Sequence, residues 1–507
     1  MSNPRVLLYQ PPYEPPEAEM KAIAPLALLY LAGVLEPAGY EVEIIDAQIE
    51  TAPLSRLRAA AADALAVGIT AMSGYQLQGA LAAAQTVRTT CPRLPLIWGG
   101  WHASLRPEET ARDPLVDVVV RGPGEYTLLE LLERIAGGQD WTGVRGITYR
   151  RGDEIVSAPD RPFAGLDPQR RLPLKKLRMD RYGGRIVCGD DWGANFSWVS
   201  GPPFPYTSSC GCPYRCRFCA ATKVYKRKWT ALPVEKTLDE LEELHRRYGI
   251  QTMYFIDPEF FIHPQRAVGI MEGMIARGLR IFWKAQVRPE HIVRLGRARM
   301  KLAYASGCRQ LEIGAESGSP AVLEMIQKDS DPQATLESAA ILRDAGIIAQ
   351  YNLIFGFPRE TARHVGETLR MAAELKRINP DCLLPMYYFT VHPGIPLEED
   401  ARAAGYVSPT SLRAWAHHVF SYSDPVMPWI RRPRRLKDRI LRTITFYLPL
   451  AYPGDVTRGT LKHLRSRMRR WPDALWLWPA HWLARLRVWL GCYAFPWEWR
   501  LFRGAAR

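Results

Sequence analysis

Short β-rich runs alternate with helical patterns along most of this 507-residue chain, and the alternation constrains the fold more than any other feature. Parallel strands need long crossovers, so such a pattern indicates α/β architecture with helices on both faces of a parallel sheet. Residues 1–137 are therefore expected to form a doubly wound, Rossmann-like domain that binds ligands at the carboxyl ends of its strands. Its strands are predicted at 5–10, 41–46, 65–70, 95–99 and 116–122, and its helices at 25–37, 75–89 and 125–135.

A connector and a second β/α series follow. Residues 138–200 are predicted to hold little regular structure besides a hairpin over 146–156. An eight-stranded barrel would need two more units than the sequence offers, so residues 201–400 are expected to form a (β/α)6 partial TIM barrel. Residues 401–507 are expected to be mainly helical. The barrel strands are predicted at 205–209, 252–257, 281–287, 310–315, 350–355 and 383–391.

Residues 421–507 differ from the rest in charge and tryptophan content. They hold 18 Lys and Arg against 5 Asp and Glu, and 8 of the 16 tryptophans. Basic runs at 431–437 and 465–470 mixed with bulky apolar residues are typical of a helix lying on an anionic membrane surface. The alternatives are a helical cap whose tryptophans pack on the barrel, or nucleic-acid binding. The sequence shows no nucleic-acid module, so peripheral membrane contact and no nucleic acid are expected.

The sequence also bears on location and cysteine chemistry. No secretory signal opens it and no run of eighteen uncharged apolar residues occurs, so the protein is expected to be cytoplasmic, with any membrane contact peripheral. Nine cysteines in a reducing compartment indicate metal or redox chemistry where they cluster.

Three cysteines form such a cluster. Cys212, Cys216 and Cys219 stand in C-x3-C-x2-C spacing just after the first strand of the second series. Thiolates at this spacing can hold one corner of an iron–sulfur cluster and leave the fourth iron open to bind substrate. A structural zinc site usually needs a second ligand pair, and none follows here. Cys210 is expected to lie outside the ligand set.

This spacing, with aromatic Phe218 before the last cysteine, resembles the signature of the radical SAM superfamily, in which SAM is S-adenosylmethionine. The resemblance implies a 4Fe-4S cluster whose open iron chelates SAM, and one-electron cleavage of SAM to a 5′-deoxyadenosyl radical. It also implies an external electron donor of the flavodoxin or ferredoxin type. Cys212, Cys216 and Cys219 are then both the metal ligands and the catalytic residues.

The same resemblance implies SAM contacts where the barrel strands end. Asp257-Pro258-Glu259 stands where the family often has a Gly-Gly-Glu-like motif that binds the methionine amine, and it departs from that motif. Arg288 could meet the carboxylate and Glu316 the ribose or amine. An ordinary barrel loop is the alternative at each position. The full set of predicted SAM-site residues is Phe218, Asp257, Glu259, Arg288, Glu316 and Gly356.

A β/α domain before such a core resembles the cobalamin-binding radical SAM subfamily. The matching runs are residues 24–32, 68–75, 98–102 and 117–125, and the two resemblances together cover about residues 5–415. Cobalamin is then expected to contact Thr70, Met72, Ser73, Gly99, Gly100, His102, Gly122, Gly124 and Glu125.

The lower face of the cobalt is less well defined by the sequence. The Asp-x-His-x-x-Gly run, by which other cobalamin enzymes supply a histidine ligand, does not occur. That face is expected to be open, or covered by a side chain from residues 72–76. His102 is expected to be a loop or phosphate contact rather than a cobalt ligand. The alternative is a domain of this shape that has lost cobalamin.

The resemblance implies a C-methyltransferase. One SAM would methylate cob(I)alamin, and a second would give the radical that removes hydrogen from an unactivated carbon, which then takes the methyl group of methylcobalamin. Tyr387, Tyr388 and His392 are candidate pocket residues. The basic, tryptophan-rich tail favours a hydrophobic, lipid-like or natural-product small molecule as substrate. The alternatives are a cobalamin-dependent oxidative cyclase or rearrangement enzyme, and a non-catalytic cobalamin- or light-sensing protein, against which the cysteines argue.

Overall fold

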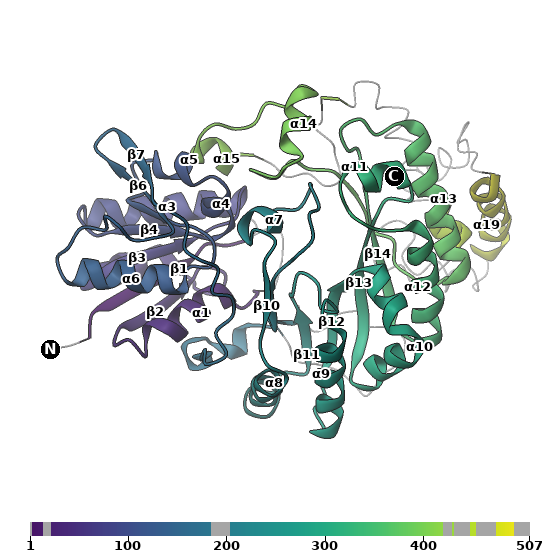
Figure 1. The fold of residues 1–507 in the computed structure, drawn as a ribbon, viewed down its shortest axis with the longest axis horizontal. Coiled ribbons are helices and arrows are strands. Elements are labelled where there is room, and N and C mark those ends of the chain that lie inside the picture. The colour runs from purple at the N-terminus through teal and green to yellow at the C-terminus, as the bar shows by residue number, and fades with distance from the viewer. Residues whose placement is uncertain are drawn as a thin grey trace.

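The computed structural model describes residues 3–13, 22–183, 203–418, 428–429, 447–452 and 473–490. Two β/α units lie side by side, and the chain returns from the second unit to the first (Figure 1). Residues 184–200 of the expected connector and both basic runs of the tail lie outside the described residues.

The first unit is a seven-stranded sheet in the order β2-β1-β3-β4-β5-β6-β7. Its first five strands run parallel, as expected for the doubly wound, Rossmann-like fold. The predicted strand positions agree with them to within two residues at each end. They are β1 (Arg5–Gln10), β2 (Glu41–Asp46), β3 (Ala64–Thr70), β4 (Leu96–Gly99) and β5 (Val118–Val120).

Helices cover both faces of this sheet because its strands are apolar on both sides. Val6 and Leu8 of β1 belong to the core under α1 and α6. Leu7 and Tyr9 point to the opposite face, into the core under α2 and α3. Two short helices follow β4. The helices are α1 (Leu26–Leu35), α2 (Pro53–Ala61), α3 (Tyr75–Thr90), α4 (Gly100–Leu105), α5 (Pro107–Ala111) and α6 (Glu125–Ala136).

The hairpin expected over residues 146–156 is present and belongs to this sheet. Its strands are β6 (Ile147–Arg151) and β7 (Glu154–Ser157), and β6 pairs antiparallel with β5. Ile147 and Tyr149 are buried in the core under α1 and α6. The sheet is therefore parallel except for this edge hairpin.

The second unit is a six-stranded parallel sheet in the order β15-β14-β13-β12-β11-β8. It confirms the expected (β/α)6 partial barrel. The strands are β8 (Phe204–Tyr206), β11 (Thr252–Phe255), β12 (Phe282–Val287), β13 (Cys308–Glu316), β14 (Ile348–Phe355) and β15 (Met386–Tyr388). The helices between them are α8 (Val234–Tyr248), α9 (Pro264–Ala276), α10 (Pro289–Ala305), α11 (Pro320–Met325), α12 (Pro332–Ala345) and α13 (Ala362–Ile378).

A small antiparallel pair that the sequence did not predict frames the cysteines. It consists of β9 (Ser209–Gly211) and β10 (Trp229–Ala231). Between these strands lie the three cysteines and α7 (Ala221–Val224). A Cβ at Gly211, whose φ is 82°, would clash with the carbonyl oxygen of Lys228, so glycine lets the two strands meet.

Residues 394–418, here called the strap, connect the second unit back to the first (Figure 1). The strap contains α14 (Glu398–Ala403) and α15 (Leu412–Ala416). Trp415 is fully buried in the core under α2 and α3, and its indole Nε1 donates a hydrogen bond to Glu109 at 3.0 Å. Arg413 forms an ion pair with Asp113 at 2.9 Å. These contacts hold the two units in one arrangement.

The described parts of the tail are helical, as expected. α17 (Leu448–Ala451) packs against α19 (Asp473–Leu490), which lies beside α13 at the end of the molecule away from the first unit (Figure 1). Among the described residues, no helix is long and apolar enough to cross a membrane.

Candidate active site

The three cysteines lie on one loop between β9 and α7, and residues 212–219 are called the cysteine loop. Cys216 is buried, Cys212 and Cys219 are partly buried, and all three thiols are free. The backbone N–H of Cys219 donates to the carbonyl of Cys216 at 3.2 Å. Thr222 Oγ1 donates to the carbonyl of Cys219 at 2.7 Å. These bonds turn the loop so that its thiols face one region.

Neighbouring segments hold the loop from two sides. The backbone N–H of Arg217 donates to Ile326 at 2.9 Å, and the carbonyl of Arg217 accepts from Leu397 of the strap at 3.0 Å. The guanidinium of Arg217 also pairs with Asp400 in α14. The loop is thus fixed between the barrel and the strap.

Asp257, a predicted SAM contact at the end of β11, fixes the residues that lead into the loop. It accepts hydrogen bonds from the backbone and hydroxyl of Ser208, at 2.8 and 2.6 Å, and from the hydroxyl of Ser209 at 2.6 Å. Its side chain is fully buried, and burial raises its pKa while these bonds act against the rise. Asp257 therefore orients the chain just before the cysteine loop.

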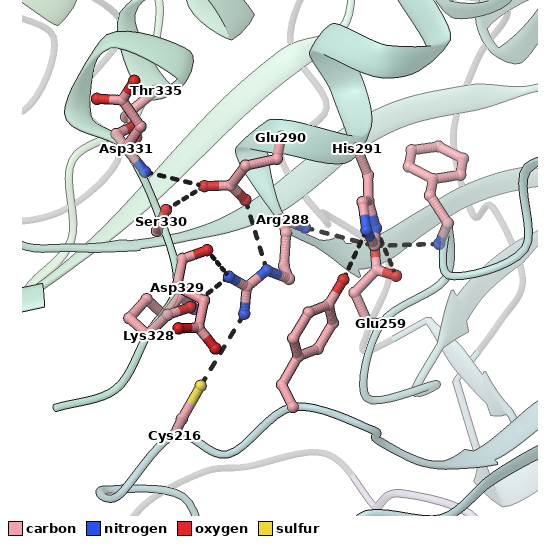
Figure 2. A network of polar contacts seen from close by, with 12 residues as sticks. Cys216, Glu259, Arg288, Glu290, His291, Lys328, Asp329, Ser330, Asp331 and Thr335 are labelled. Atoms are coloured by element: carbon pink, nitrogen blue, oxygen red, sulfur yellow. Dashed lines mark hydrogen bonds and ion pairs between the residues drawn. The ribbon is translucent and has the colours of Figure 1, made fainter. Parts of the chain in front are cut away.

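Arg288, which follows β12, places a fixed positive charge beside the loop (Figure 2). The buried guanidinium lies with Nη1 4.0 Å from Cys216 Sγ and stacks 3.9 Å above the ring of Tyr214. Its Nη2 donates to the carbonyls of Lys328 and of Asp329, the latter at 2.7 Å. A cation held this way stabilises negative charge on the sulfur of Cys216.

Glu259 lies beside Arg288 in a second buried network (Figure 2). Its Oε1 accepts from the backbone N–H groups of Phe261 at 3.1 Å and Arg288 at 3.4 Å. Its Oε2 lies 2.8 Å from Nδ1 of His291, whose Nε2 lies 2.7 Å from the hydroxyl of Tyr214. The network therefore fixes the aromatic ring on which Arg288 stacks.

Glu316 stands at a β-bulge that ends β13. The register of β13 with β14 shifts between Gly314 and Glu316, and Glu316 has a φ of 59°, which is rare for a residue other than glycine. Its carboxylate accepts from Nζ of Lys328 at 2.9 Å. A Cβ at Gly314 would lie 2.6 Å from this carboxylate, so the glycine leaves room for the pair.

Lys328 carries its charge although it is buried. Burial disfavours the ammonium, but Glu316 and Cys216 outweigh it, and the pKa of Lys328 is raised above its ordinary value. The ion pair therefore lies as two fixed charges beside the thiols.

The cysteine loop suits an iron–sulfur cluster. Burial, with smaller contributions from charge on Cys219 and Cys216, raises the pKa of Cys212 to about 11, so the three thiols lie close together. Bound iron stabilises thiolates and reverses this effect. Among the described residues, no three His, Cys, Asp or Glu side chains converge as around a single ion. A cluster takes its cysteines on different irons and does not require that convergence.

Phe218 and Gly356 lie together on the side of the loop nearest β14. The rings of Phe218 and Phe357 meet edge to face at 6.1 Å. The backbone N–H of Gly356 donates to Glu360, whose pKa is raised to about 7 by burial, and its carbonyl accepts from Trp429 at 3.0 Å. Phe218 and Gly356 are therefore brought to the same site as the cysteines.

The predicted pocket residues lie on and after β15. Tyr388 is buried and Tyr387 is half-buried, both within the strand. His392 follows it, and burial, with a smaller contribution from His418 in the strap, lowers its pKa to about 4. His392 is therefore neutral near pH 7, and its part in a substrate pocket stays a prediction.

The predicted cobalamin contacts meet at the carboxyl ends of three adjacent parallel strands. This edge faces the second unit: the rings of Trp101 and Tyr225 lie 5.8 Å apart, and a Cβ at Gly122 would be 3.9 Å from the carbonyl of Val224 in α7. Thr70, Met72 and Ser73 end or follow β3, Gly99, Gly100 and His102 end or follow β4, and Gly122, Gly124 and Glu125 follow β5.

His102 is the most buried polar side chain of this set, at 1% exposure. Its Nδ1 lies 2.7 Å from the hydroxyl of Ser73, and its Nε2 has no hydrogen-bond partner within the described part of the chain. Burial, with a smaller contribution from the charge of Arg106, lowers its pKa to about 3. A neutral imidazole with a spare nitrogen suits the expected contact with a bound cofactor.

Small and apolar groups form another part of this edge. Gly100 has a φ of 89°, and a Cβ there would lie 2.6 Å from Oγ1 of Thr70, so glycine lets the two strand ends close together. The side chain of Met72 is 44% exposed. Its backbone N–H donates to Gln76 at 2.8 Å. An apolar side chain on a glycine-lined edge suits a bulky ring such as a corrin.

Glu125 and Cys210 lie where the two units meet. Burial raises the pKa of Cys210 to about 12, and the charge of Glu125 adds to the rise. Cys210 itself belongs to β9 and pairs with Thr230 of β10. It therefore lies before the cysteine loop, on the side of Glu125.

Sequence reasoning missed His291, Lys328 and Trp415, which contact the predicted residues. His291 had a signal, because Arg288-Pro289-Glu290-His291 concentrates polar groups just after a strand. Trp415 had none, because it is 306 residues along the chain from Glu109, which it contacts. Lys328 had none, because it lies in a loop between helices rather than at the end of a strand. The assignment of individual residues to SAM or cobalamin stays a prediction.

Comparison with known proteins gives two family matches. Residues 21–132 match the B12 binding domain, and residues 206–372 match the radical SAM superfamily. An uncharacterized methyltransferase of Pyrococcus horikoshii is 29% identical over 459 residues, which cover 88% of this chain and 92% of that protein. The anaerobic magnesium-protoporphyrin IX monomethyl ester cyclase of Rubrivivax gelatinosus is 28% identical, over 74% of this chain and 66% of that one.

The fold also matches a solved structure. The radical S-adenosylmethionine methyltransferase TsrM from Kitasatospora setae, with cobalamin and a 4Fe-4S cluster bound, superposes with a TM-score of 0.62 at 21% identity. The match covers 81% of this chain and 80% of TsrM. The two family matches, rather than the likeness in fold, show that a B12 binding domain precedes a radical SAM domain in this chain and that the protein is a radical SAM enzyme. The cofactors that these two domains imply are a 4Fe-4S cluster, SAM and cobalamin.

Proposed function

We propose that this enzyme transfers a methyl group to an unactivated carbon of a hydrophobic or natural-product substrate. The observation that supports this most is the contact of the two cofactor-binding regions, where Trp101 meets Tyr225 and Gly122 lies near Val224. Two cofactors can act on one carbon only if they are held on either side of it. The relative from Pyrococcus horikoshii is named a methyltransferase and matches this chain along most of its length. This similarity supports the same reaction.

The protein's part in this reaction is to bind and orient. When bound, the cluster and SAM would supply the radical chemistry that removes hydrogen from carbon, and cobalamin would supply the methyl group. Cys212, Cys216 and Cys219 would hold the cluster, with an external flavodoxin- or ferredoxin-type donor supplying electrons. Arg288 would keep a positive charge beside Cys216. The residues at and just after the carboxyl ends of β3, β4 and β5 would hold cobalamin against the second unit.

The predicted SAM contacts divide into two kinds. Asp257 and Glu259 accept several bonds from the protein's own backbone and hydroxyl groups, so we propose that they position the loops around SAM. Glu316 and Lys328 form a buried pair of opposite charges beside the thiols. The methionine part of SAM carries both an ammonium and a carboxylate, so this pair suits it.

Oxidative ring formation is the second candidate. The Rubrivivax gelatinosus relative is named a cyclase, and its similarity is close to that of the methyltransferase relative. Both reactions begin with hydrogen removal from carbon, so the residues around the cysteine loop do not separate them. Product mass does, because methyl transfer adds about 14 Da and ring formation removes about 2 Da.

The test is anaerobic turnover of the reconstituted holoenzyme with cobalamin, a reductant and SAM whose methyl group carries deuterium. Lipid and natural-product extracts serve as the substrate pool. We expect a product about 17 Da heavier than its precursor, with 5′-deoxyadenosine and S-adenosylhomocysteine formed together. A product that is lighter than its precursor and carries no deuterium would show that the enzyme forms a ring rather than transfers a methyl group. The Cys216→Ala variant and enzyme without cobalamin are the controls, and enzyme that never cleaves SAM would point to a sensor instead.

A further inference from the structure

Helix α19 (Asp473–Leu490) has one buried face and one exposed face. The buried face consists of Leu477, His481, Ala484 and Val488, with at most 6% exposure each. His481 Nδ1 lies 2.8 Å from the carbonyl of Leu450 in α17. The four buried residues follow one another at spacings of four, three and four, which is the spacing of one helix face. The orientation of α19 on the protein is therefore fixed.

The opposite face is apolar and open to solvent. We call it the tryptophan stripe, and on an α-helix its members fall within an arc of roughly 80°. Scattered exposed apolar residues are common, but a continuous apolar row over four turns marks an interaction surface. The stripe consists of Leu475 (60% exposed), Trp478 (47%), Trp482 (60%), Leu486 (49%) and Trp489 (80%).

Charge indicates what the stripe contacts. Between residues 473 and 490 the only acidic residue is Asp473, and the guanidinium of Arg485 lies 5.4 Å from the ring centre of Trp482. The segment 421–507 holds 18 basic residues against 5 acidic ones. Tryptophan favours the membrane–water interface, and basic residues favour anionic headgroups. A second copy of the chain would instead bring like charges together.

The position of α19 leaves the active site clear. α19 lies beyond α13, at the opposite end of the molecule from the first unit (Figure 1). Since no described helix can span a bilayer, the stripe suits a helix lying in the plane of the surface.

We propose that the tryptophan stripe docks this enzyme on the surface of an anionic lipid bilayer, with α19 parallel to the membrane. Apolar side chains enter the headgroup region while Arg485 meets lipid phosphates. The inference stands apart from the reaction type, because it depends only on α19 and the charge of the tail.

Vesicle flotation of the full-length holoenzyme tests the proposal. We expect binding to phosphatidylglycerol-containing vesicles at least about tenfold tighter than to pure phosphatidylcholine, weakening as salt rises. In the Trp478→Ser/Trp482→Ser/Trp489→Ser variant, binding should fall by about 100-fold or more. The matched control is Ile275→Ser/Val407→Ser, which removes apolar side chains 44% and 86% exposed elsewhere and should bind normally.

Folding and self-association are followed in the same samples. The three tryptophans are exposed, so circular dichroism and SAM cleavage in detergent-free buffer should stay at wild-type levels in the triple variant. Wild-type protein that stays off anionic vesicles, or a triple variant that floats with them equally well, would overturn the proposal. A third outcome would also overturn it: the wild-type protein sediments as a dimer, the triple variant sediments as a monomer, and neither binds vesicles. The stripe would then contact a second copy of the chain.

Discussion

The two cofactor-binding regions differ in how they treat charge. Around the cysteine loop, buried charges are held in pairs and networks, with Arg288 beside Cys216 and Lys328 bonded to Glu316. At the strand ends of the first unit, the predicted contacts are neutral or small apart from the carboxylate of Glu125. His102 is uncharged near pH 7 there, and Gly100 closes the edge.

The difference follows from the ligands that each region must hold. Thiolates, the cluster and the amino-acid part of SAM carry charge, and a buried charge needs a fixed counter-charge. A corrin is bulky and spreads its contacts, so it needs space and a few hydrogen bonds more than nearby charge. The region around the cysteine loop is therefore sensitive to loss of charge. The strand ends of the first unit are sensitive to loss of space.

The largest effect is expected from Cys216→Ala. Two thiolates hold a cluster poorly, so the 4Fe-4S absorption and electron paramagnetic resonance signals should disappear and SAM cleavage should fall at least about 1000-fold. The matched control is Cys210→Ala, whose thiol lies in β9 outside the loop and should be dispensable. A Cys210 variant that loses its iron would show that the ligand set is wrong.

Gly100→Ala tests the demand for space in the first unit. The added Cβ would press on Thr70 at 2.6 Å in a backbone with positive φ, so we expect a loss of about 3 kcal/mol in free energy of unfolding. Gly138→Ala has a similar φ of 65° with nothing within 4 Å, and should cost only about 1 kcal/mol. Urea unfolding of the apo-protein measures both, and equal losses would remove the packing argument.

His102→Gln tests the neutral character of that region. The pKa of His102 is about 3 in the folded protein and has its ordinary value of 6.5 in the unfolded chain. As the pH falls from 6.5 toward 3, only the unfolded chain therefore takes up the proton. Stability should therefore drop by about 2 kcal/mol between pH 7 and pH 5 on account of this residue, and the variant should lack that part of the drop. The exposed His417→Gln is the control, and should keep the wild-type pH dependence in urea unfolding.

Arg288→Gln tests the fixed charge on the other side, with the smallest expected effect. Without the cation near Cys216, adding an electron to the cluster becomes harder, so its reduction potential should shift by roughly 60 mV to more negative values, a tenfold change. Redox titration followed by electron paramagnetic resonance measures it. Arg288→Lys should recover part of the shift. The control is Arg215→Gln. Arg215 lies on the cysteine loop and forms an exposed ion pair with Asp329, and its loss should leave the potential unchanged. An equal shift in this variant would refute a specific role for Arg288.

The fold was largely predictable because strand signals are local. All five parallel strands of the first sheet and all six of the second fall where apolar runs predicted them. The β9–β10 pair was missed because neither Ser209–Gly211 nor Trp229–Ala231 is an apolar run, so each strand is identified by its partner rather than its composition. The strap was missed because α15 is five residues long and its Trp415 is buried only by contact with the first unit.

The sequence by itself determined the cysteine triplet, the two parallel sheets and the basic, tryptophan-rich tail, because each is encoded in the spacing or composition of neighbouring residues. Only the tertiary structure decided that Arg288 lies beside Cys216, because the barrel brings the loops of separate strands together. It also decided that Lys328 pairs with Glu316, because the turn after α11 folds back toward the end of β13. It also decided that Trp478, Trp482 and Trp489 lie on the exposed face of α19. Helical spacing defines a face, but only packing against α13 and α17 determines which face meets the protein.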